Sequence, residues 1–137
     1  MIPVTAAIIL HEQRVLVARR APYKHMGCYW EFPGGKIESG ETPEESLARE
    51  LSEEMGITIE VGRHFYSNEH DYGDKQIVLM AYLCKWCGGE LVLNDHDAIK
   101  WCTSFEITSL NWAPADEPIV QALVAAVKES KRSINLI

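Results

Sequence analysis

The chain has 137 residues, of which 47% are hydrophobic and 24% charged, and 20 acidic side chains outnumber 13 basic ones to leave a net charge of −7. This length and composition predict a single globular domain, residues 1–137, that buries a core of its own. The excess of negative charge repels phosphate backbones and anionic lipids, so we expect neither a nucleic acid polymer nor a membrane surface as a partner.

The first part of the chain combines strand patterns with a polar and aromatic loop. The apolar, β-branched segments 4–9 and 14–18 flank the polar residues 11–13, which is typical of a β-hairpin. Residues 19–30 are aperiodic and rich in basic and aromatic side chains, so we expect a functional loop there. The segment 31–36, EFPGGK, contains a proline and two glycines, which end regular structure and let the backbone approach a ligand.

A helix is predicted over residues 43–55. Thr42 supplies a capping hydroxyl before it, and Pro43 suits its first position. Glu45, three residues after the cap, completes a capping box. Gly56 tolerates the left-handed backbone conformation that ends many helices.

The second half of the chain continues with strand patterns and closes with a helix. Segments rich in β-branched and aromatic residues predict strands, and glycine and polar clusters predict the turns between them. In chain order these are strands at 57–66 and 76–84 joined by a polar loop at 71–74, a turn at Gly88-Gly89, a short strand at 99–102 and a helix at 119–127. This order predicts an α/β (α+β) fold in which helices cover the faces of a mixed sheet.

Three glutamates share one face of the helix predicted at 43–55. Residues three and four apart are helical neighbours, which places Glu50, Glu53 and Glu54 side by side, next to an apolar face that would pack into the core. Clustered carboxylates repel one another, and a hard divalent cation relieves the repulsion because it prefers oxygen ligands. We therefore expect Mg²⁺ at this face, with Mn²⁺ as an alternative. For an isolated acidic run, a solvated helix face is the competing interpretation.

The whole segment around this helix resembles the box of the Nudix family, G-x5-E-x7-R-E-U-x-E-E-x-G-U, in which U is aliphatic. Each fixed place is filled, in order, by Gly35, Glu41, Arg49, Glu50, Leu51, Glu53, Glu54, Gly56 and Ile57. The resemblance implies an α/β/α sandwich and Mg²⁺-dependent hydrolysis of a nucleoside diphosphate linked to another group. It also implies metal ligation by the carbonyl of Gly34 and the carboxylates of Glu50, Glu53 and Glu54.

Two catalytic roles follow from the same resemblance. Arg49 would orient one of the metal-binding glutamates. The proton of the attacking water would pass to Glu50, to Glu53 or to an acid outside the box. Asp95 is the outside candidate, because small family members similar to this chain carry an acidic residue in the corresponding loop; an Asx turn is its alternative role.

Similarity extends beyond the box to segments 19–21, 25–26, 31–36 and 114–118, which resemble the MutT-like branch of the family. Members of that branch hydrolyse a nucleoside triphosphate to a monophosphate and pyrophosphate. The resemblance implies nucleotide contacts for Arg20 and His25, a pocket lined by Glu31, Phe32, Pro33 and Gly34, and a base edge that faces Asp116.

Asp116 stands where the MutT-type oxidised-guanine enzyme has asparagine. An ionised aspartate only accepts hydrogen bonds, so it needs a donor on the base. Cytosine offers its N4 amino group and 8-oxoguanine its N7–H, whereas plain guanine presents acceptors on that edge and is disfavoured unless Asp116 is protonated. Two substrate hypotheses stay open: 8-oxo-dGTP on one side, and CTP, dCTP or 5-methyl-dCTP on the other. Capping the closing helix is another role that Asp116 can fill.

Two other functions fit the same motif. One is a dinucleotide or sugar-nucleotide hydrolase in which Tyr72 stacks on a base. The other is a non-catalytic nucleotide sensor, which the intact set of box glutamates disfavours. Tyr29 and Trp30, in the predicted loop, are also candidates for base stacking. We expect His64, His70 and His96 to be half-buried or surface residues without a role in the site.

The four cysteines form no regular framework, which predicts free thiols in a reducing cytoplasm. Cys84 and Cys87 lie three apart on a predicted strand and point to opposite faces, which disfavours a metal or redox pair. The N-terminal sequence MIPVTAAIIL lacks a basic segment and a cleavage site, so neither export nor a membrane span is expected. Both a monomer and a homodimer remain open.

Overall fold

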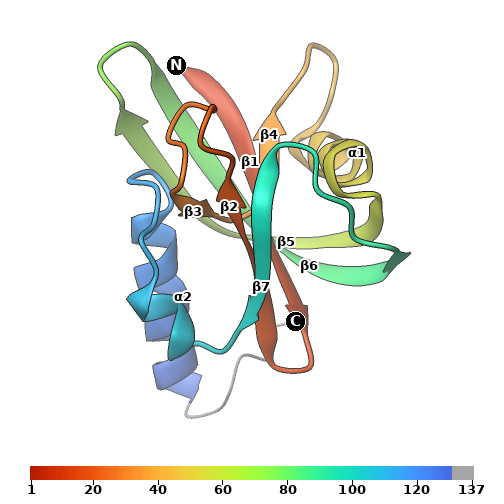
Figure 1. Ribbon diagram of the computed structural model, residues 1–137, viewed down its shortest axis with the longest axis vertical. Coiled ribbons are helices and arrows are strands. Elements are labelled where there is room, and N and C mark those ends of the chain that lie inside the picture. Colours follow the sequence, from red (N-terminus) through yellow and green to blue (C-terminus); the bar gives the residue numbers. More distant parts are fainter. Residues whose placement is uncertain (131–137) are drawn as a thin grey trace.

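A mixed sheet of seven strands forms the centre of the computed structural model, which describes residues 1–130 (Figure 1). In chain order the strands are β1 (Ile2–His11), β2 (Arg14–Arg20), β3 (Trp30–Glu31), β4 (Gly34–Lys36), β5 (Ile57–Asp71), β6 (Gln76–Gly89) and β7 (His96–Cys102). Within the same residues the helices are α1 (Pro43–Met55), the 3₁₀ helix η1 (Glu106–Ser109) and α2 (Glu117–Ser130).

One parallel pair makes this sheet mixed. The strand order is β3-β2-β1-β6-β5, with β4 paired to β1 and β7 paired to β2. The central strands β1 and β6 run parallel, in a register that extends from Ile2 opposite Ile77 to Leu10 opposite Lys85. The other strand pairs are antiparallel. The mixed sheet predicted from the order of elements is therefore confirmed.

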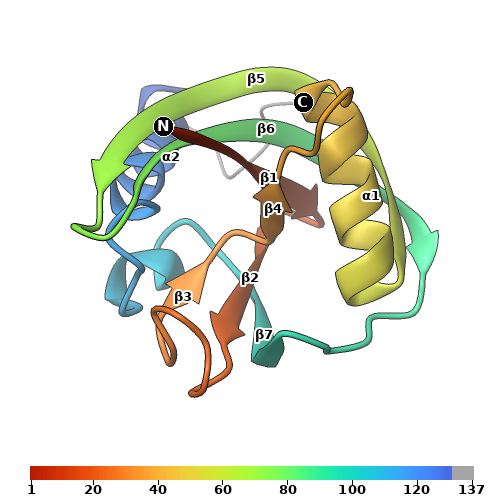
Figure 2. The same ribbon diagram turned by 90° about the horizontal axis from the view of Figure 1, so that it is seen from above.

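The two long helices cover opposite faces of the sheet, as the view from above shows (Figure 2). Successive side chains on a strand point to opposite faces, so neighbours on β1 enter different cores. Ala6 and Ile8 pack into the core on the α2 side, whereas Ala7 and Ile9 pack into the core on the α1 side. These two apolar cores give the chain its three layers and confirm the predicted α/β/α sandwich.

Helix α1 begins and ends where the sequence predicts, because its caps are encoded locally. The Thr42 hydroxyl accepts a hydrogen bond from the Glu45 amide at 3.1 Å, and the Glu45 carboxylate accepts one from the Thr42 amide at 2.9 Å. Gly56 follows the helix in the left-handed conformation, with a φ of 68°. Since a side-chain cap of this kind is worth about 1 kcal/mol, the helix that carries the box glutamates has well-defined ends.

Several predicted boundaries are wrong, because strand pairing outweighs local sequence preference. Residues 30–36, predicted as irregular, contribute β3 and β4, whose backbones pair with β2 and β1. β5 continues past its predicted end at residue 66, since its polar residues stay paired with β6 as far as Asp71. The predicted turn at Gly88-Gly89 is instead the end of β6. The closing helix is also longer than predicted, at Glu117–Ser130.

The described residues also show the state of the cysteines and the character of the helices. All four cysteines are free thiols; Cys84 is buried and Cys87 exposed, as expected for residues three apart on a strand. Among residues 1–130, no helix has both the length and the apolar character needed to cross a bilayer. The last seven residues of the predicted domain, 131–137, lie outside the described residues.

Gly34 is a position at which β4 lies too close to β1 for a side chain. A Cβ at Gly34 would lie 2.0 Å from the carbonyl oxygen of Thr5, whereas a Cβ at Gly73 would meet nothing within 4 Å, although φ at Gly73 is 92°. We expect Gly34→Ala to lower the free energy of unfolding by about 3 kcal/mol through the clash. Gly73→Ala should cost about 1 kcal/mol through its backbone conformation alone. Urea denaturation compares the two, and equal losses would show that β4 moves away from β1 without cost.

Candidate active site

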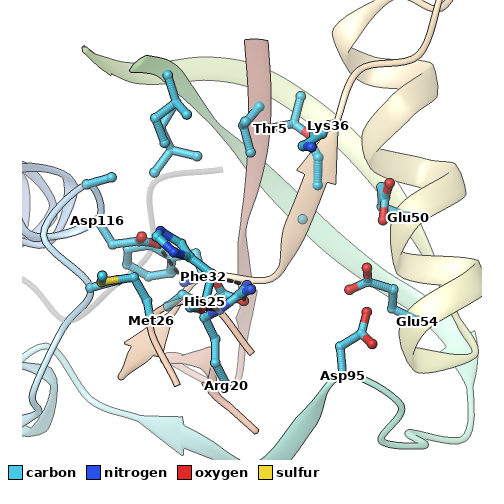
Figure 3. Close-up of a pocket in the computed structure, with 18 of the residues that line it drawn as sticks. Thr5, Arg20, His25, Met26, Phe32, Lys36, Glu50, Glu54, Asp95 and Asp116 are labelled. Atoms are coloured by element: carbon cyan, nitrogen blue, oxygen red, sulfur yellow. Dashed lines mark hydrogen bonds and ion pairs between the residues drawn. The ribbon is translucent and has the colours of Figure 1, made fainter. Parts of the chain in front are cut away.

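A cavity of about 530 Å³ opens beside β4 and is lined by residues from both ends of the chain. Figure 3 shows its labelled side chains in two groups. Glu50, Glu54 and Asp95 form one end, which we call the carboxylate end, and His25, Met26, Phe32 and Asp116 form the other, which we call the nucleoside end. Between them lie Thr5, Arg20 and Lys36.

The carboxylate end combines side chains from α1 and from the loop before β7. Glu50 and Glu54 line the cavity from successive turns of α1. The carboxyl of Asp95 lies next to that of Glu54 and faces it (Figure 3). The Glu53 side chain is 61% exposed and bonds to Arg49 at 3.2 Å, outside the cavity. The structure therefore brings Glu50, Glu54 and Asp95 together, and a ligand or base role for Glu53 stays a prediction.

Crowding among these acids changes how they hold protons. Burial, together with the adjacent carboxyls of Glu50 and Asp95, raises the pKa of Glu54 to about 9. Asp95 is affected in the opposite direction, because Lys24 Nζ lies 3.0 Å from its Oδ1 and lowers the pKa of Asp95. At neutral pH the Glu54 carboxyl thus keeps a proton unless a cation takes the place of that proton.

Arg49 ties this end of the cavity to the loop before α1. Its Nε and Nη2 donate to the two carboxylate oxygens of Glu41 at 2.6 and 2.9 Å, which helps to lower the pKa of Glu41 to about 2. Its Nη1 donates to Glu50 at 3.1 Å and to Glu53 at 3.2 Å. Two parallel hydrogen bonds between a guanidinium and a carboxylate fix the orientation of both groups as well as the distance between them. The geometry is compatible with the orienting role predicted for Arg49.

The glycines of β4 bring backbone close to Glu50. A Cβ at Gly35 would lie 2.4 Å from the carboxyl carbon of Glu50, so only glycine fits there without a shift of that side chain. Gly34 and Gly35 both line the cavity. Pro33 does not line it: its carbonyl accepts a hydrogen bond from the Ala7 amide at 2.7 Å and anchors the segment to β1. Because Pro33 does not line the cavity, the predicted contact between Pro33 and the substrate stays a prediction without structural support.

This donor set has the chemistry that a hard divalent cation requires. The cavity offers carboxylate oxygens from Glu50, Glu54 and Asp95 beside the backbone of Gly34 and Gly35, and Mg²⁺ prefers such oxygen ligands. The space that a Cβ of Gly35 would fill lies directly against the Glu50 carboxylate. In the part of the chain that the structure describes, no three His, Cys, Asp or Glu side chains already surround one point. The residues fit a metal, and the exact ligand set stays a prediction.

At the nucleoside end, Asp116 reaches the cavity from the start of α2. Its Oδ2 accepts a hydrogen bond from the Phe32 amide at 3.0 Å, and only 5% of the residue is exposed. Burial, and then the negative charge of Glu31, raise the pKa of Asp116 well above its usual range. The Asp116 carbonyl accepts hydrogen bonds from the first turn of α2, while its side chain bonds to Phe32 instead. One residue thus joins the helix start to the cavity.

A half-buried network of hydrogen bonds holds Glu31 in the same region. Arg20 Nη1 donates to both Glu31 oxygens at 3.2 Å, and His96 Nε2 lies 2.8 Å from one of them. The His96 side chain is 1% exposed, and its Nδ1 has no hydrogen-bond partner among residues 1–130. The interpretation of His96 as a half-buried or surface residue is wrong, because the strand that follows Asp95 turns it inward. The only hint in the sequence is that His96 directly follows Asp95, a candidate site residue; its contact with Glu31 leaves no hint.

The aromatic residues around the cavity differ from those expected. Trp30 is 7% exposed and belongs to the core on the α2 side, so the interpretation of Trp30 as a base-stacking residue is wrong. Tyr29 does not line the cavity either. Phe32 and Tyr72 are the aromatic rings that do, and the Tyr72 ring meets that of His25 edge to face with centroids 5.2 Å apart. These three rings surround the space beside Asp116.

Comparison with known proteins adds a family and several relatives. Residues 1–123 match the family model described as the NUDIX domain. The chain is 37% identical over 125 residues to the CTP pyrophosphohydrolase of Escherichia coli K12, covering 91% of this chain and 93% of that protein. It is 36% identical over 121 residues to the 8-oxo-dGTP diphosphatase of the same strain, covering 88% and 94%. The solution structure of the E. coli ORF135 protein matches with a TM-score of 0.83 at 35% identity, covering 96% of this chain and 93% of that one.

The raised pKa of Glu54 predicts how the metal-free protein responds to pH. The folded protein holds this proton up to a pH of about 9, whereas an ordinary glutamate loses it near 4.5. Between these values the unfolded state binds fewer protons, so the stability that the protonated carboxyl contributes is lost as the pH rises. We expect the thermal midpoint, measured with EDTA, to fall over this range, and to fall less in Glu54→Gln. Equal slopes in the two proteins would contradict the assignment.

Proposed function

The chain belongs to the Nudix family and is a pyrophosphohydrolase of MutT type, and from this premise we propose that it hydrolyses a nucleoside triphosphate to the monophosphate and pyrophosphate with Mg²⁺ as cofactor. The base that we propose is cytosine, 5-methylcytosine or 8-oxoguanine. The two similar proteins of E. coli, named for CTP and for 8-oxo-dGTP, support a triphosphate substrate and keep both kinds of base in view.

The observation that carries this proposal is that a single cavity contains both a cluster of acids and an apolar wall with a buried carboxyl. The carboxylate end offers the oxygens of Glu50, Glu54 and Asp95 to a cation and phosphates. The nucleoside end offers the Phe32 ring and the Asp116 carboxyl to a base. A pocket that combines an apolar wall with a few placed polar groups is typical of a small-molecule site. A nucleoside triphosphate has these two halves joined in one molecule.

The residues of the carboxylate end have separate tasks in this reaction. When held by Glu50 and Glu54, Mg²⁺ would neutralise phosphate oxygens and lower the pKa of a water molecule. The Asp95 carboxyl faces that of Glu54 and is our candidate to take the proton of the attacking water, while Lys24, 3.0 Å from Oδ1, lowers the pKa of Asp95. Arg49 keeps the Glu50 carboxylate directed at the cavity through the bond at 3.1 Å.

The state of Asp116 bears on which base is bound. Its raised pKa favours the protonated carboxyl, which donates one hydrogen bond and still accepts others. Cytosine, at N3 and N4, and 8-oxoguanine, at O6 and N7, each present an acceptor beside a donor and match this pattern. The expectation from sequence disfavours plain guanine only for an ionised Asp116. A protonated Asp116 also gives plain guanine one hydrogen bond, so discrimination against guanine is weaker than for an ionised aspartate.

Hydrolysis is tested by pyrophosphate release from a panel of CTP, dCTP, 5-methyl-dCTP and 8-oxo-dGTP. We expect Mg²⁺-dependent turnover of at least one of them, and a loss of about a hundredfold or more in kcat/KM for Glu54→Gln, which removes a charged oxygen from the cation site. Glu44→Gln is the matched control, because Glu44 is exposed on the same helix and does not line the cavity. Wild-type turnover by Glu54→Gln, or faster hydrolysis of ADP-ribose or a dinucleotide, would count against the proposal.

The proton on Asp116 is tested with Asp116→Asn. An amide offers the same donor and acceptor as a protonated carboxyl, so the variant should keep the wild-type ranking of bases at any pH at which the Asp116 carboxyl holds its proton. As the pH rises, the wild-type carboxyl ionises and loses its donor, whereas the amide does not. We therefore expect the kcat/KM ratio of dCTP to dGTP to depend on pH in the wild type and not in the variant. An altered ranking for Asp116→Asn at every pH would indicate an ionised aspartate.

A further inference from the structure

We propose that Asn68 and Tyr72, at the end of β5 remote from α1, are positioning residues for base selection: together they hold the backbone of Ala115 and so fix the direction of the Asp116 side chain. The inference rests on the proposed function, since it concerns how the nucleoside end distinguishes one base from another. Neither residue belongs to the box, and Asn68 does not line the cavity.

Both backbone polar groups of Ala115 are bound by side chains from this end of β5. The Tyr72 hydroxyl accepts a hydrogen bond from the Ala115 amide at 3.1 Å. The Asn68 side-chain amide donates to the Ala115 carbonyl at 3.0 Å. The residue directly before Asp116 is therefore held at its N–H and at its C=O, which leaves it little freedom to rotate.

The opposite side of the same segment is held by β3. The Ala113 amide donates to the Trp30 carbonyl at 2.8 Å, and Asp116 Oδ2 accepts from the Phe32 amide at 3.0 Å. The chain that leads into α2 thus bridges two parts of the sheet, and the Asp116 carboxyl lies at the bridge. A shift of the Ala115 backbone would move this carboxyl relative to the Phe32 amide and to any base beside it.

The Tyr72 ring is itself fixed before a ligand arrives. His70 meets it edge to face with centroids 4.4 Å apart, and His25 does so at 5.2 Å. The ring lines the cavity while its hydroxyl points to the segment before α2. Tyr72 therefore joins a wall of the nucleoside end to the backbone that carries Asp116. Asn68 adds the second bond without any contact with the cavity, so an effect of Asn68 on base preference would have to pass through Ala115.

The test separates base selection from hydrolysis by measuring how nucleoside monophosphates bind in the absence of metal. Calorimetric titration with CMP, 5-methyl-dCMP, 8-oxo-dGMP and GMP gives the ratio of Kd values between the weakest and the tightest ligand. Asn68→Ala and Tyr72→Phe each remove one hydrogen bond to Ala115, and we expect each to lower that ratio about fivefold. Glu69→Ala is the control, since the Glu69 side chain is exposed on the same strand, and it should keep the wild-type ratio.

A second measurement distinguishes positioning from a general loss of structure. Tyr72→Phe keeps the ring, so its thermal midpoint should stay close to that of the wild type, while hydrogen exchange of the Ala115 amide becomes faster. For Asn68→Ala we expect a higher KM for the preferred triphosphate and an unchanged kcat. A protein that is merely destabilised would show a lower thermal midpoint and a lower kcat as well. Faster exchange at Ala115 and a higher KM without these losses therefore indicate a positioning role.

The results can refute the positioning role of Asn68 and Tyr72 and the proposed hydrolysis independently of each other. Unchanged Kd ratios in both variants, an equal weakening for every base, or a wild-type protein that binds all four monophosphates alike would overturn the role of Asn68 and Tyr72. Selective binding that both variants flatten, in a protein that hydrolyses no triphosphate, would support the positioning role and refute the proposed reaction.

Discussion

The guanidinium of Arg49 is the contact on which the carboxylate end of the cavity depends. Three segments meet at it: the loop that carries Glu41, the carbonyl of Lys36 at the end of β4, and α1 itself. Without this cation, the acids of the loop and the helix would repel one another at close range, and Glu50 would lose the hydrogen bond that links its direction, through Arg49, to the Lys36 carbonyl of β4. A positive side chain with several fixed donors satisfies both needs at once. The packing of α1 on the sheet then places the ordered acids beside the cavity.

The sheet joins this end to the nucleoside end. α1 belongs to the core on one face and α2 to the core on the other; α1 carries Glu50 and Glu54 to the cavity, and Asp116 reaches it from the position directly before α2. β1 passes between them and contributes Val4 and Thr5 to the cavity wall, and β4 lies on β1 so closely that only glycine fits at position 34. The distance between the carboxylate end and the nucleoside end is therefore set by the close packing of the strands between them.

Local features of the fold could be predicted from sequence, and contacts between distant strands could not. α1 was predicted within its observed bounds because Thr42, Glu45 and Gly56 act within one turn of the helix ends. His96 meets Glu31 across 65 positions of sequence, and Asn68 meets Ala115 across 47, so neither contact leaves a periodic or motif signal. Glu53 shows a different limit: the helical period places it beside Glu50, but its side chain contacts Arg49 and solvent and does not line the cavity.

The separation of the two apolar cores has a consequence for how such a protein diverges. A substitution that repacks the α2 layer alters the walls around the base while the acids on the α1 layer stay in place. Under the proposed function, the bound base can therefore change over generations without displacing the acids that would hold the cation, because the two groups of residues are anchored to different layers. Such independence would let a single scaffold supply enzymes for several nucleotide pools, each adjusted on one side of the sheet.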